Sequence, residues 1–339
     1  MKIINAGYQL IKEPSISKKI ERIARVCYKS EDKIKDGTDI AMIKALVDRQ
    51  HMAMLEHGDM AFEVGPGIYD ALKNIRNNIE SIAYDMNNTL KRNYLRFTEH
   101  HEEGWNQTRY VVSGNMRAWL ETFDYSSLKS MDGAWPIPYG IYTVLTSVFP
   151  FLNEEERYEY HVVCDDCKYI TDYSTLSDAE RMVHETFSVL FTVDRGVTHE
   201  LVRMRECSFA QESTRYCNYN LGKFGNEITV ISPCFWDEDS DMYKEWKMAM
   251  ADAEIHYFEL TKLGAKPQEA RDALPTSVKA DIVMTTNLQE WKHVFNLRAC
   301  DSTGPAHPQM HEIMVPLFKD MRAMYSFAFG NMIAYDECR

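Results

Sequence analysis

The sequence predicts an α+β protein whose central sheet, mixed or antiparallel, is flanked by long helices. Stretches in which apolar and polar side chains alternate indicate strands, and stretches with apolar side chains every three or four positions indicate helices. The two kinds of stretch follow one another without a regular strand–helix–strand order, which argues against a parallel α/β sheet. We therefore expect one domain covering residues 1–339, with a helical and irregular elaboration at about 68–179.

Three segments carry the strand pattern and seven carry the helical pattern. The clearest strand is the segment 186–193, because Phe187, Val189 and Phe191 alternate with small polar residues. The other strands are expected at residues 59–64 and 280–286. Helices are expected at residues 17–28, 39–50, 68–88, 114–123, 241–263, 288–298 and 308–327.

Several of these helices have recognisable ends. Asp39 is expected to be the N-cap of the second helix, and Gly264 to end the helix over residues 241–263. Residues 194–196 indicate a turn, with Thr198 as the N-cap of a short helix that continues to about Glu206. The long helix is expected to bury the face formed by Met242, Trp246, Met250, Ala253, Tyr257 and Leu260.

An excess of acidic residues restricts the partners of the chain. It has 51 acidic and 38 basic residues and a net charge of −13, whereas a broad nucleic-acid-binding surface needs clustered lysine and arginine. No apolar run is long enough for a membrane span, and the N-terminus lacks the pattern of a signal peptide. The eight cysteines are scattered, as expected of reduced thiols. We expect a cytoplasmic protein that binds neither nucleic acid nor membrane.

The densest chemical signal is a polar segment from Thr198 to Tyr216, directly after the expected strand at 186–193. Three arginines, two serines, a threonine and a glutamine fall within thirteen positions, 203–215. Arginine presents a rigid fork of donors that suits phosphate, and hydroxyl and backbone N–H groups complete such an anion site. Alternatively, these arginines pair with the abundant acids at a surface or a subunit contact.

Residues 203–215 resemble the signature of flavin-dependent thymidylate synthases, R-H-R-x-x-S followed by S-x-R. Other segments resemble the family in the same order: the pattern H-x-x-x-x-E-H at residues 51–57, then residues 191–200, 271–275 and 287–307. Several matches in order are more specific than one short motif. The resemblance covers roughly residues 17–317 and implies the family's α+β fold, with the elaboration longer than in compact members.

The resemblance implies an enzyme that converts dUMP to dTMP, with methylenetetrahydrofolate as carbon donor and NADPH as reductant, passing the hydride through FAD. It also implies a homotetramer whose sites are assembled from several subunits. Arg298, facing the pyrimidine ring, and Ser213, contacting phosphate or base, are the catalytic candidates. Cys207 and Cys217 are expected to pack rather than act as nucleophiles. The implied nucleotide contacts are Glu200, Gln211, Ser213, Thr214, Arg215, Arg271 and Arg298.

The residues that the resemblance assigns to FAD are Ser30, His51, Glu56, Arg203, Met204, Arg205, Asn287, Gln289, His293 and His307. Two of them depart from the family pattern, because Met204 stands where the motif has histidine and Gln289 where it has arginine. Methionine has no hydrogen to donate, and glutamine has no positive charge. If both contacts serve FAD, its binding is weaker by roughly 2–4.5 kcal/mol.

These departures leave two alternatives beside thymidylate synthase. One is a flavin enzyme that modifies C5 of another pyrimidine nucleotide or transfers another one-carbon group, and the other is a non-catalytic relative that keeps nucleotide binding. The presence of Ser213, Arg215, Arg271 and Arg298 favours an enzyme, because drift after loss of activity would not spare the nucleotide side selectively. No metal site is expected, since the C-x-x-C of Cys164 and Cys167 lacks a second ligand pair.

Overall fold

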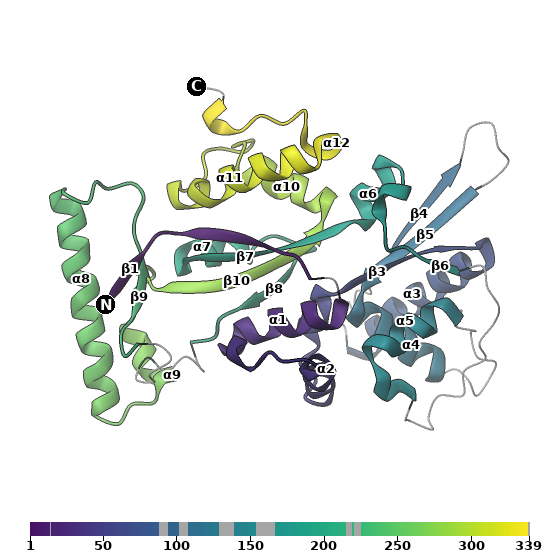
Figure 1. Ribbon diagram of the computed structural model, residues 1–339, viewed down its shortest axis with the longest axis horizontal. Helices are drawn as coiled ribbons and strands as arrows, with labels where there is room; N and C mark the ends of the chain where they lie inside the picture. The colour runs from purple at the N-terminus through teal and green to yellow at the C-terminus, as the bar shows by residue number, and fades with distance from the viewer. Residues whose placement is uncertain are drawn as a thin grey trace. The chain divides into compact units, whose positions relative to one another are not determined.

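The chain divides into two compact units in the computed structural model of this protein, which describes residues 1–13, 15–87, 94–101, 108–128, 139–153, 167–214, 219 and 225–337 (Figure 1). Unit 1 consists of Met1–Lys12, Arg22–Lys33 and Phe187–Arg339, and unit 2 of Glu13–Glu21 and Ile34–Thr186. The predicted elaboration at 68–179 falls within unit 2, which also includes residues on both sides of it. That the whole chain forms one domain stays a prediction.

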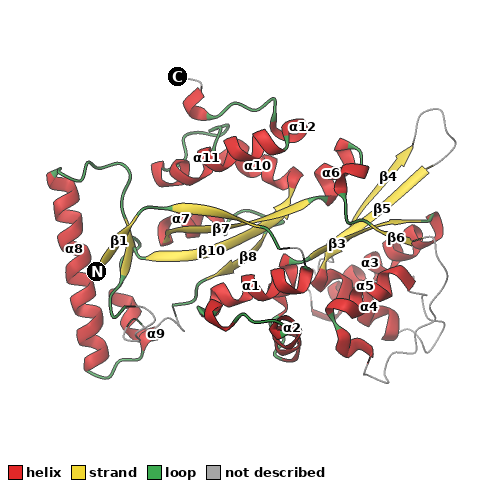
Figure 2. Cartoon of the chain, in the orientation of Figure 1, coloured by secondary structure: helices red, strands yellow, loops and turns green. Residues whose placement is uncertain are grey.

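Unit 1 is built on a four-stranded sheet with the order β2-β7-β10-β8. Its strands are β2 (Gly7–Ile11), β7 (Thr186–Asp194), β8 (Ser208–Gln211) and β10 (Lys279–Asn287). The pairs β2–β7 and β8–β10 are antiparallel, while β1 (Lys2–Ile4) and β9 (Thr229–Ile231) form a separate parallel pair. Helices and strands are mixed along the chain, so the predicted α+β class is confirmed (Figure 2).

The helices of unit 1 bury aromatic side chains. In α10 (Leu288–Arg298), Trp291 and Phe295 are fully buried, and Phe295 packs on Phe318 of α11 (Pro308–Met324) with ring centroids 5.4 Å apart. In α8 (Asp241–Lys262), Trp246, Met250 and Tyr257 join a second buried cluster. The remaining helices are α7 (Arg195–Leu201), α9 (Pro267–Ala270) and α12 (Ser326–Phe329).

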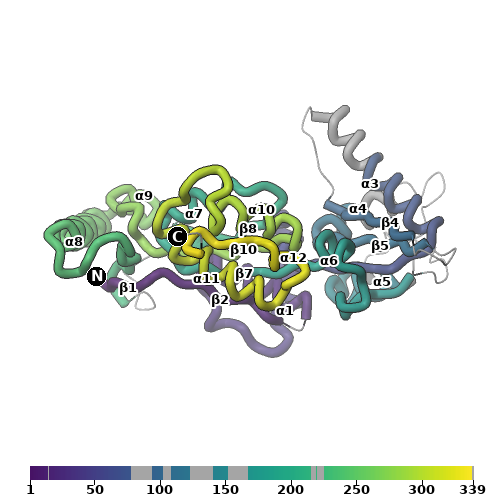
Figure 3. The backbone as a smooth tube through the Cα atoms, turned by 90° about the horizontal axis from the view of Figure 1, so that it is seen from above, coloured from purple at the N-terminus to yellow at the C-terminus, as the bar shows by residue number. Residues whose placement is uncertain are grey.

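Unit 2 contains a second four-stranded sheet, β4-β5-β3-β6, in which every pair is antiparallel. Figures 1 and 3 both show α6 (Asp178–His184) beside β5. The strands are β3 (Asp59–Val64), β4 (Arg96–His101), β5 (Thr108–Asn115) and β6 (Cys167–Tyr169). The other helices are α2 (Thr38–Asp48), α3 (Pro66–Asn87), α4 (Met116–Leu128) and α5 (Tyr139–Val148), while α1 (Ile16–Tyr28) has residues in both units.

Two capping predictions and one turn prediction are wrong, because other residues begin the two helices. Asp39 is not the N-cap of α2, since its carboxylate accepts a hydrogen bond from the hydroxyl of Ser17 at 2.5 Å and Gly37 occupies the cap position. Thr198 lies inside α7 and is not its N-cap. Residues 194–196 do not form a separate turn, because Asp194 ends β7 and α7 begins at Arg195. The carboxylate of Asp194 accepts from the backbone N–H of Val197 at 2.7 Å and begins α7 there.

The outer ends of two predicted helices also differ. Met242 and Leu260 were expected on the buried face of α8 but are 59% and 37% exposed, because the face that packs on the core is centred on Tyr243, Trp246, Met250 and Tyr257 and lies to one side of them. The predicted C-terminal helix ends at Met324 and is followed by α12. Among the helices that the structure describes, none is long and apolar enough to cross a membrane.

A buried histidine makes unit 2 sensitive to acid. His184 is fully buried between the hydroxyl groups of Ser113, 2.7 Å from Nδ1, and Thr98, 2.8 Å from Nε2. Burial, and after it the positive charge of Arg96, lowers the pKa of His184 from 6.5 to about 3. The unfolded chain therefore binds a proton below about pH 6.5 that the folded chain does not, and stability is lost as the pH falls through this window.

We expect the free energy of unfolding to fall by up to about 1.4 kcal/mol per pH unit between pH 6 and pH 4 because of this one group. The substitution His184→Gln, which stays neutral, should flatten that slope in urea denaturation series. His101→Gln, at an exposed site of the same unit, serves as the control. Equal slopes for the wild type and His184→Gln would contradict the prediction.

Candidate functional site

The polar segment predicted to bind an anion lies across the edge of the unit 1 sheet. It leaves α7, passes through the residues Val202–Cys207 and becomes β8, which pairs with β10 in the register Ser208↔Thr285 to Gln211↔Ile282. At the end of β8 the chain continues to Ser213 and Thr214, while Arg215 lies outside the described residues. The short strand thus separates the two halves of the predicted site.

The half after β8 holds two contacts between predicted nucleotide residues and their neighbours. Gln211 donates from Nε2 to Oγ1 of Thr198 on α7 at 3.0 Å. Arg271, at the start of the short 3-10 helix Arg271–Ala273, donates from Nη1 to Oγ1 of Thr214 at 3.1 Å. Arg271 is exposed and Thr214 is half-buried, so a cation and a hydroxyl stand together at an accessible place. Such a pair suits an anionic oxygen.

Arg298, the predicted catalytic residue, ends α10 and pairs with Glu200 of α7. The distance from Nη1 to Oε2 is 2.9 Å, and the side chains are 18% and 30% exposed. Nε of Arg298 is buried and has no hydrogen-bond partner among the described residues. Glu200 therefore orients the guanidinium through Nη1, while the unpartnered Nε carries the free-energy cost of a buried donor.

The structure brings these residues together as three pairs rather than as one cluster. Thr198 and Glu200 belong to the same helix but are two positions apart, and side chains at that spacing do not share a face. The partner role of Thr198 was not predicted, because nothing in a sequence marks a mid-helix threonine as the acceptor for a glutamine thirteen residues on.

The half before β8 carries predicted flavin residues from two distant segments. The hydroxyl of Thr286, at the end of β10, donates to the backbone oxygen of Glu206 at 2.9 Å. This contact places the segment Arg203–Glu206 next to Asn287, which caps α10 by accepting from the N–H of Glu290 at 2.8 Å. Arg203 and Arg205 are exposed, and Met204 between them is half-buried.

Gln289 and His293 extend this half along the first turns of α10. They are four positions apart, so they lie on one face of the helix, and both are exposed. His307 caps α11 and packs edge-to-face on Phe235 with ring centroids 5.6 Å apart. Ser30 follows α1, with its N–H donating to the oxygen of Arg25 at 3.1 Å.

Two predicted flavin residues belong to unit 2. His51 is exposed ahead of the 3-10 helix Met52–His57, and Glu56 lies within that helix. The carboxylate of Glu56 pairs with Nη1 of Arg117 at 2.7 Å, and Arg117 also binds Glu121 on α4 at 3.0 Å. Arg117 was not among the predicted site residues.

Cys207, inside the polar segment, is a protonated thiol. Its Sγ lies 3.2 Å from the backbone oxygen of Arg205. Burial, together with the negative charge of Glu290, raises the pKa of Cys207 from 9.0 to about 12. Since the thiolate is the nucleophilic form, this cysteine is suited to packing. Among the described residues, no group of three His, Cys, Asp or Glu side chains is placed to hold a metal ion, and Cys164 and Cys217 lie outside them.

The fold and the site define an α+β protein whose predicted site residues lie at the two ends of the strand β8 and in the segments next to it. A family model described as thymidylate synthase complementing protein matches residues 154–324. The chain belongs to this family.

Two relatives are flavin-dependent thymidylate synthases of archaea. The protein of Pyrococcus abyssi (strain GE5 / Orsay) is 40% identical over 196 residues, which cover 57% of this chain and 71% of the relative. The protein of Pyrococcus furiosus is 32% identical over 205 residues, covering 60% of this chain and 74% of the relative. A solved structure of a UMP/dUMP methylase, PolB from Streptomyces cacaoi, is 19% identical over 43% of this chain and 68% of that one, with a TM-score of 0.34. A likeness at that TM-score decides nothing about function.

The protonated state of Cys207 has a measurable consequence. A pKa near 12 rather than 9.0 leaves about a thousandfold less thiolate at pH 8, so alkylation by iodoacetamide should be slow in the folded protein and ordinary in urea. Peptide mapping by mass spectrometry reports the rate at this residue. Rapid labelling of Cys207 in the folded protein would show that the thiol is activated and contradict its assignment to packing.

Proposed function

We propose that the protein is a flavin-dependent thymidylate synthase, converting dUMP to dTMP with methylenetetrahydrofolate as carbon donor and NADPH as reductant. Membership of the family and the names of the two archaeal relatives support the reaction. The observation that carries the proposal is the partly buried Arg298–Glu200 pair, in which the guanidinium is oriented through Nη1 while its Nε has no hydrogen-bond partner among the described residues.

The nucleotide phosphate is assigned to the segment after β8. Nη1 of Arg271 and the hydroxyl of Thr214 already stand 3.1 Å apart, and the preceding residue in the sequence, Ser213, carries a second hydroxyl. A phosphate dianion has oxygens enough to accept from both hydroxyls and from a guanidinium fork. Gln211 is held by Thr198 at the start of this segment and is assigned to the nucleotide as well.

Arg298 is assigned to the pyrimidine ring. For C5 of uracil to attack an electrophilic carbon, the ring must first hold extra electron density, which its carbonyl oxygens share as negative charge, and a fixed cation beside these oxygens stabilises that charge. Glu200 holds the guanidinium at 2.9 Å and so limits the reorganisation needed during the reaction. A covalent cysteine is not needed in this chemistry, which agrees with the raised pKa of Cys207.

The residues before β8 fit a flavin dinucleotide. Two exposed arginines, Arg203 and Arg205, flank the half-buried thioether of Met204, a donor set suited to a diphosphate beside an apolar surface. Asn287, Gln289 and His293 add polar groups from α10, and Ser30, His51, Glu56 and His307 complete the assignment. When bound, FAD would carry the hydride from NADPH. We further propose a homotetramer, in which residues that one chain leaves apart meet across subunits.

The reaction is tested by incubating the purified protein with dUMP, methylenetetrahydrofolate, NADPH and FAD and assaying dTMP by mass spectrometry. We expect dTMP to form, and Arg298→Met to lower kcat by about 10²–10³ because the developing charge loses its cation. Arg322→Met removes a paired arginine elsewhere in unit 1 and should leave kcat within about twofold. Modification of UMP or dCMP but not dUMP would replace the proposed substrate, and binding without turnover of any nucleotide would indicate a non-catalytic relative.

The two departures at the flavin residues make a separate prediction. Met204→His should tighten FAD binding by about 2- to 10-fold, the value of one neutral hydrogen bond at a half-buried position. Gln289→Arg should have a smaller effect, because the site is exposed and solvent screens the added charge. Flavin fluorescence titrations measure both dissociation constants. A larger gain from Gln289→Arg would mean that FAD contacts α10 more closely than the Arg203–Arg205 segment.

A further inference from the structure

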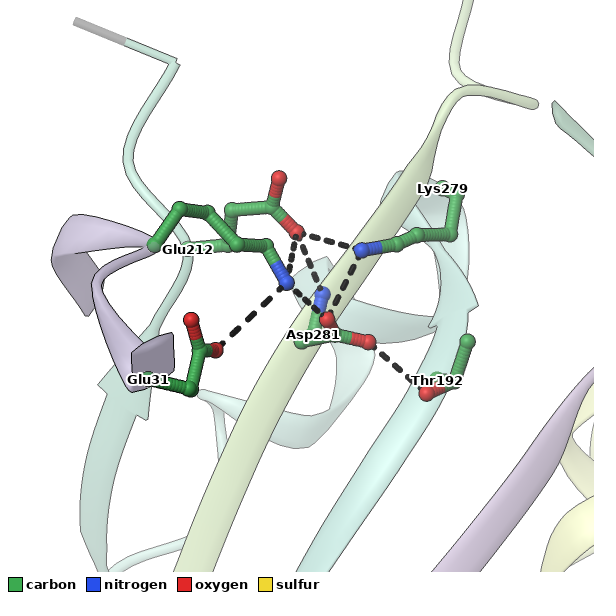
Figure 4. A network of polar contacts seen from close by, with 6 residues as sticks. Glu31, Thr192, Glu212, Lys279 and Asp281 are labelled. Atoms are coloured by element: carbon green, nitrogen blue, oxygen red, sulfur yellow. Dashed lines mark hydrogen bonds and ion pairs between the residues drawn. The ribbon is translucent and has the colours of Figure 1, made fainter. Parts of the chain in front are cut away.

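Four charged side chains of unit 1 form a cluster where the end of α1, the end of β8 and the start of β10 meet (Figure 4). The four-charge cluster consists of Lys29, Glu212, Lys279 and Asp281. Nζ of Lys279 lies 2.8 Å from Oε2 of Glu212 and 2.7 Å from Oδ2 of Asp281, and Nζ of Lys29 contacts the same two oxygens. No side chain of the cluster is more than 18% exposed, and Glu212 is 3% exposed.

The opposite charges of the cluster stabilise the charged forms of Asp281 and Lys29. Burial acts to raise the pKa of Asp281, but Lys279 and Lys29 outweigh it and the pKa is lowered. Burial acts to lower the pKa of Lys29, but Glu212 and Asp281 outweigh it and the pKa is raised. A buried ion pair is weak evidence for stability, because well-packed apolar residues of the same size often stabilise a protein as much. The presence of two buried ion pairs at this place therefore needs an explanation other than stability.

The position of Glu212 supplies one. It stands between Gln211 and Ser213, and it is tied to β10 twice: its N–H donates to the backbone oxygen of Asp281 at 2.8 Å, and its Oε2 accepts from the N–H of Asp281 at 3.1 Å. Adjacent residues of an extended chain point to opposite sides. A buried Glu212 therefore directs its two neighbours, both assigned to the nucleotide, away from the cluster.

Lys29 ties a second segment to the same point. It precedes Ser30, which is assigned to the flavin, and the N–H of Ser213 donates to the backbone oxygen of Cys27 at 3.3 Å. Lys29 has a positive φ of 47°, at the end of a helix where glycine is the usual residue. In this backbone conformation the ammonium of Lys29 reaches both Glu212 and Asp281.

We propose that the four-charge cluster is a positioning device, which fixes the nucleotide segment Gln211–Thr214 against the segment that ends in Ser30. Its members are positioning residues and touch neither ligand. The inference rests on the proposed function and adds to it four residues that the family signature does not contain. Thr192 of β7 also belongs to the device. Its hydroxyl donates to Oδ1 of Asp281 at 2.7 Å and so ties the Asp281 carboxylate to β7.

The test compares dUMP binding by calorimetry, steady-state kinetics and thermal unfolding. Glu212→Gln keeps the shape but weakens both ammonium contacts, so we expect the Kd and KM for dUMP to rise about tenfold, equivalent to 1.4 kcal/mol. The charge-balanced double variant Lys279→Met with Glu212→Gln leaves Lys29 paired with Asp281 and should show the same rise without loss of folding. Lys279→Arg keeps the positive charge and should bind dUMP as the wild type does. Lys29→Gly relieves the backbone conformation while removing the ammonium, so it should weaken dUMP binding without lowering the Tm.

Arg322→Met, which breaks the pair with Glu337 in the same unit, is the control and should leave the KM for dUMP unchanged. Variants that lower the Tm but keep the wild-type Kd and KM would overturn the inference and leave a purely structural cluster. A double variant that folds and binds dUMP as the wild type does would overturn it as well. A wild-type protein that neither binds dUMP nor forms dTMP would instead overturn the proposed function on which the inference rests.

Discussion

The antiparallel pairing of β8 with β10 is the constraint on which the site depends. β8 and β10 pair through four residue pairs, from Ser208↔Thr285 to Gln211↔Ile282. Beyond one end, Thr286 binds the backbone of Glu206, and beyond the other, the ladder continues from Glu212 to Asp281. A slip of one residue would turn every side chain of β8 to the opposite face. The contacts at the two ends of β8 therefore fix its register. They also fix the position of the residues assigned to flavin and nucleotide.

These two ends differ in how firmly their polar side chains are held. After β8, Gln211 is bonded to Thr198, Thr214 to Arg271, and the backbone is fixed by the four-charge cluster. Before β8, Arg203 and Arg205 are exposed. A site whose groups are already oriented loses less conformational freedom on binding. The half after β8, which is assigned to the nucleotide, is accordingly the more preorganised one. The half before β8, which is assigned to the flavin, depends more on a ligand to order its side chains.

Local patterns were enough to predict most of the elements that carry the site. β3 and α10 have the predicted bounds, and β7 and β10 differ by one or two residues at their ends, because alternation and helical periodicity depend only on near neighbours. One error, at the start of α7, was a local choice of the wrong capping residue, whereas other contacts involve side chains far apart in the sequence. Ser17 claims the carboxylate of Asp39 across 22 positions, and Lys29 reaches Asp281 across 252. No local pattern shows such pairs, so the four-charge cluster could not be predicted.

The same distinction explains why the departure at Met204 is compatible with the rest of the site. Met204 lies in a segment that is anchored through Glu206, whose backbone oxygen makes the contact with Thr286. A backbone contact does not depend on the identity of the neighbouring side chains, so replacing a histidine there leaves the segment in place. On the proposed assignment the change removes a side-chain contact to FAD and leaves the backbone contact of Glu206 unchanged. At Glu212 the reverse holds, because the side chain itself carries the anchor, and a substitution there disturbs the position of both neighbours.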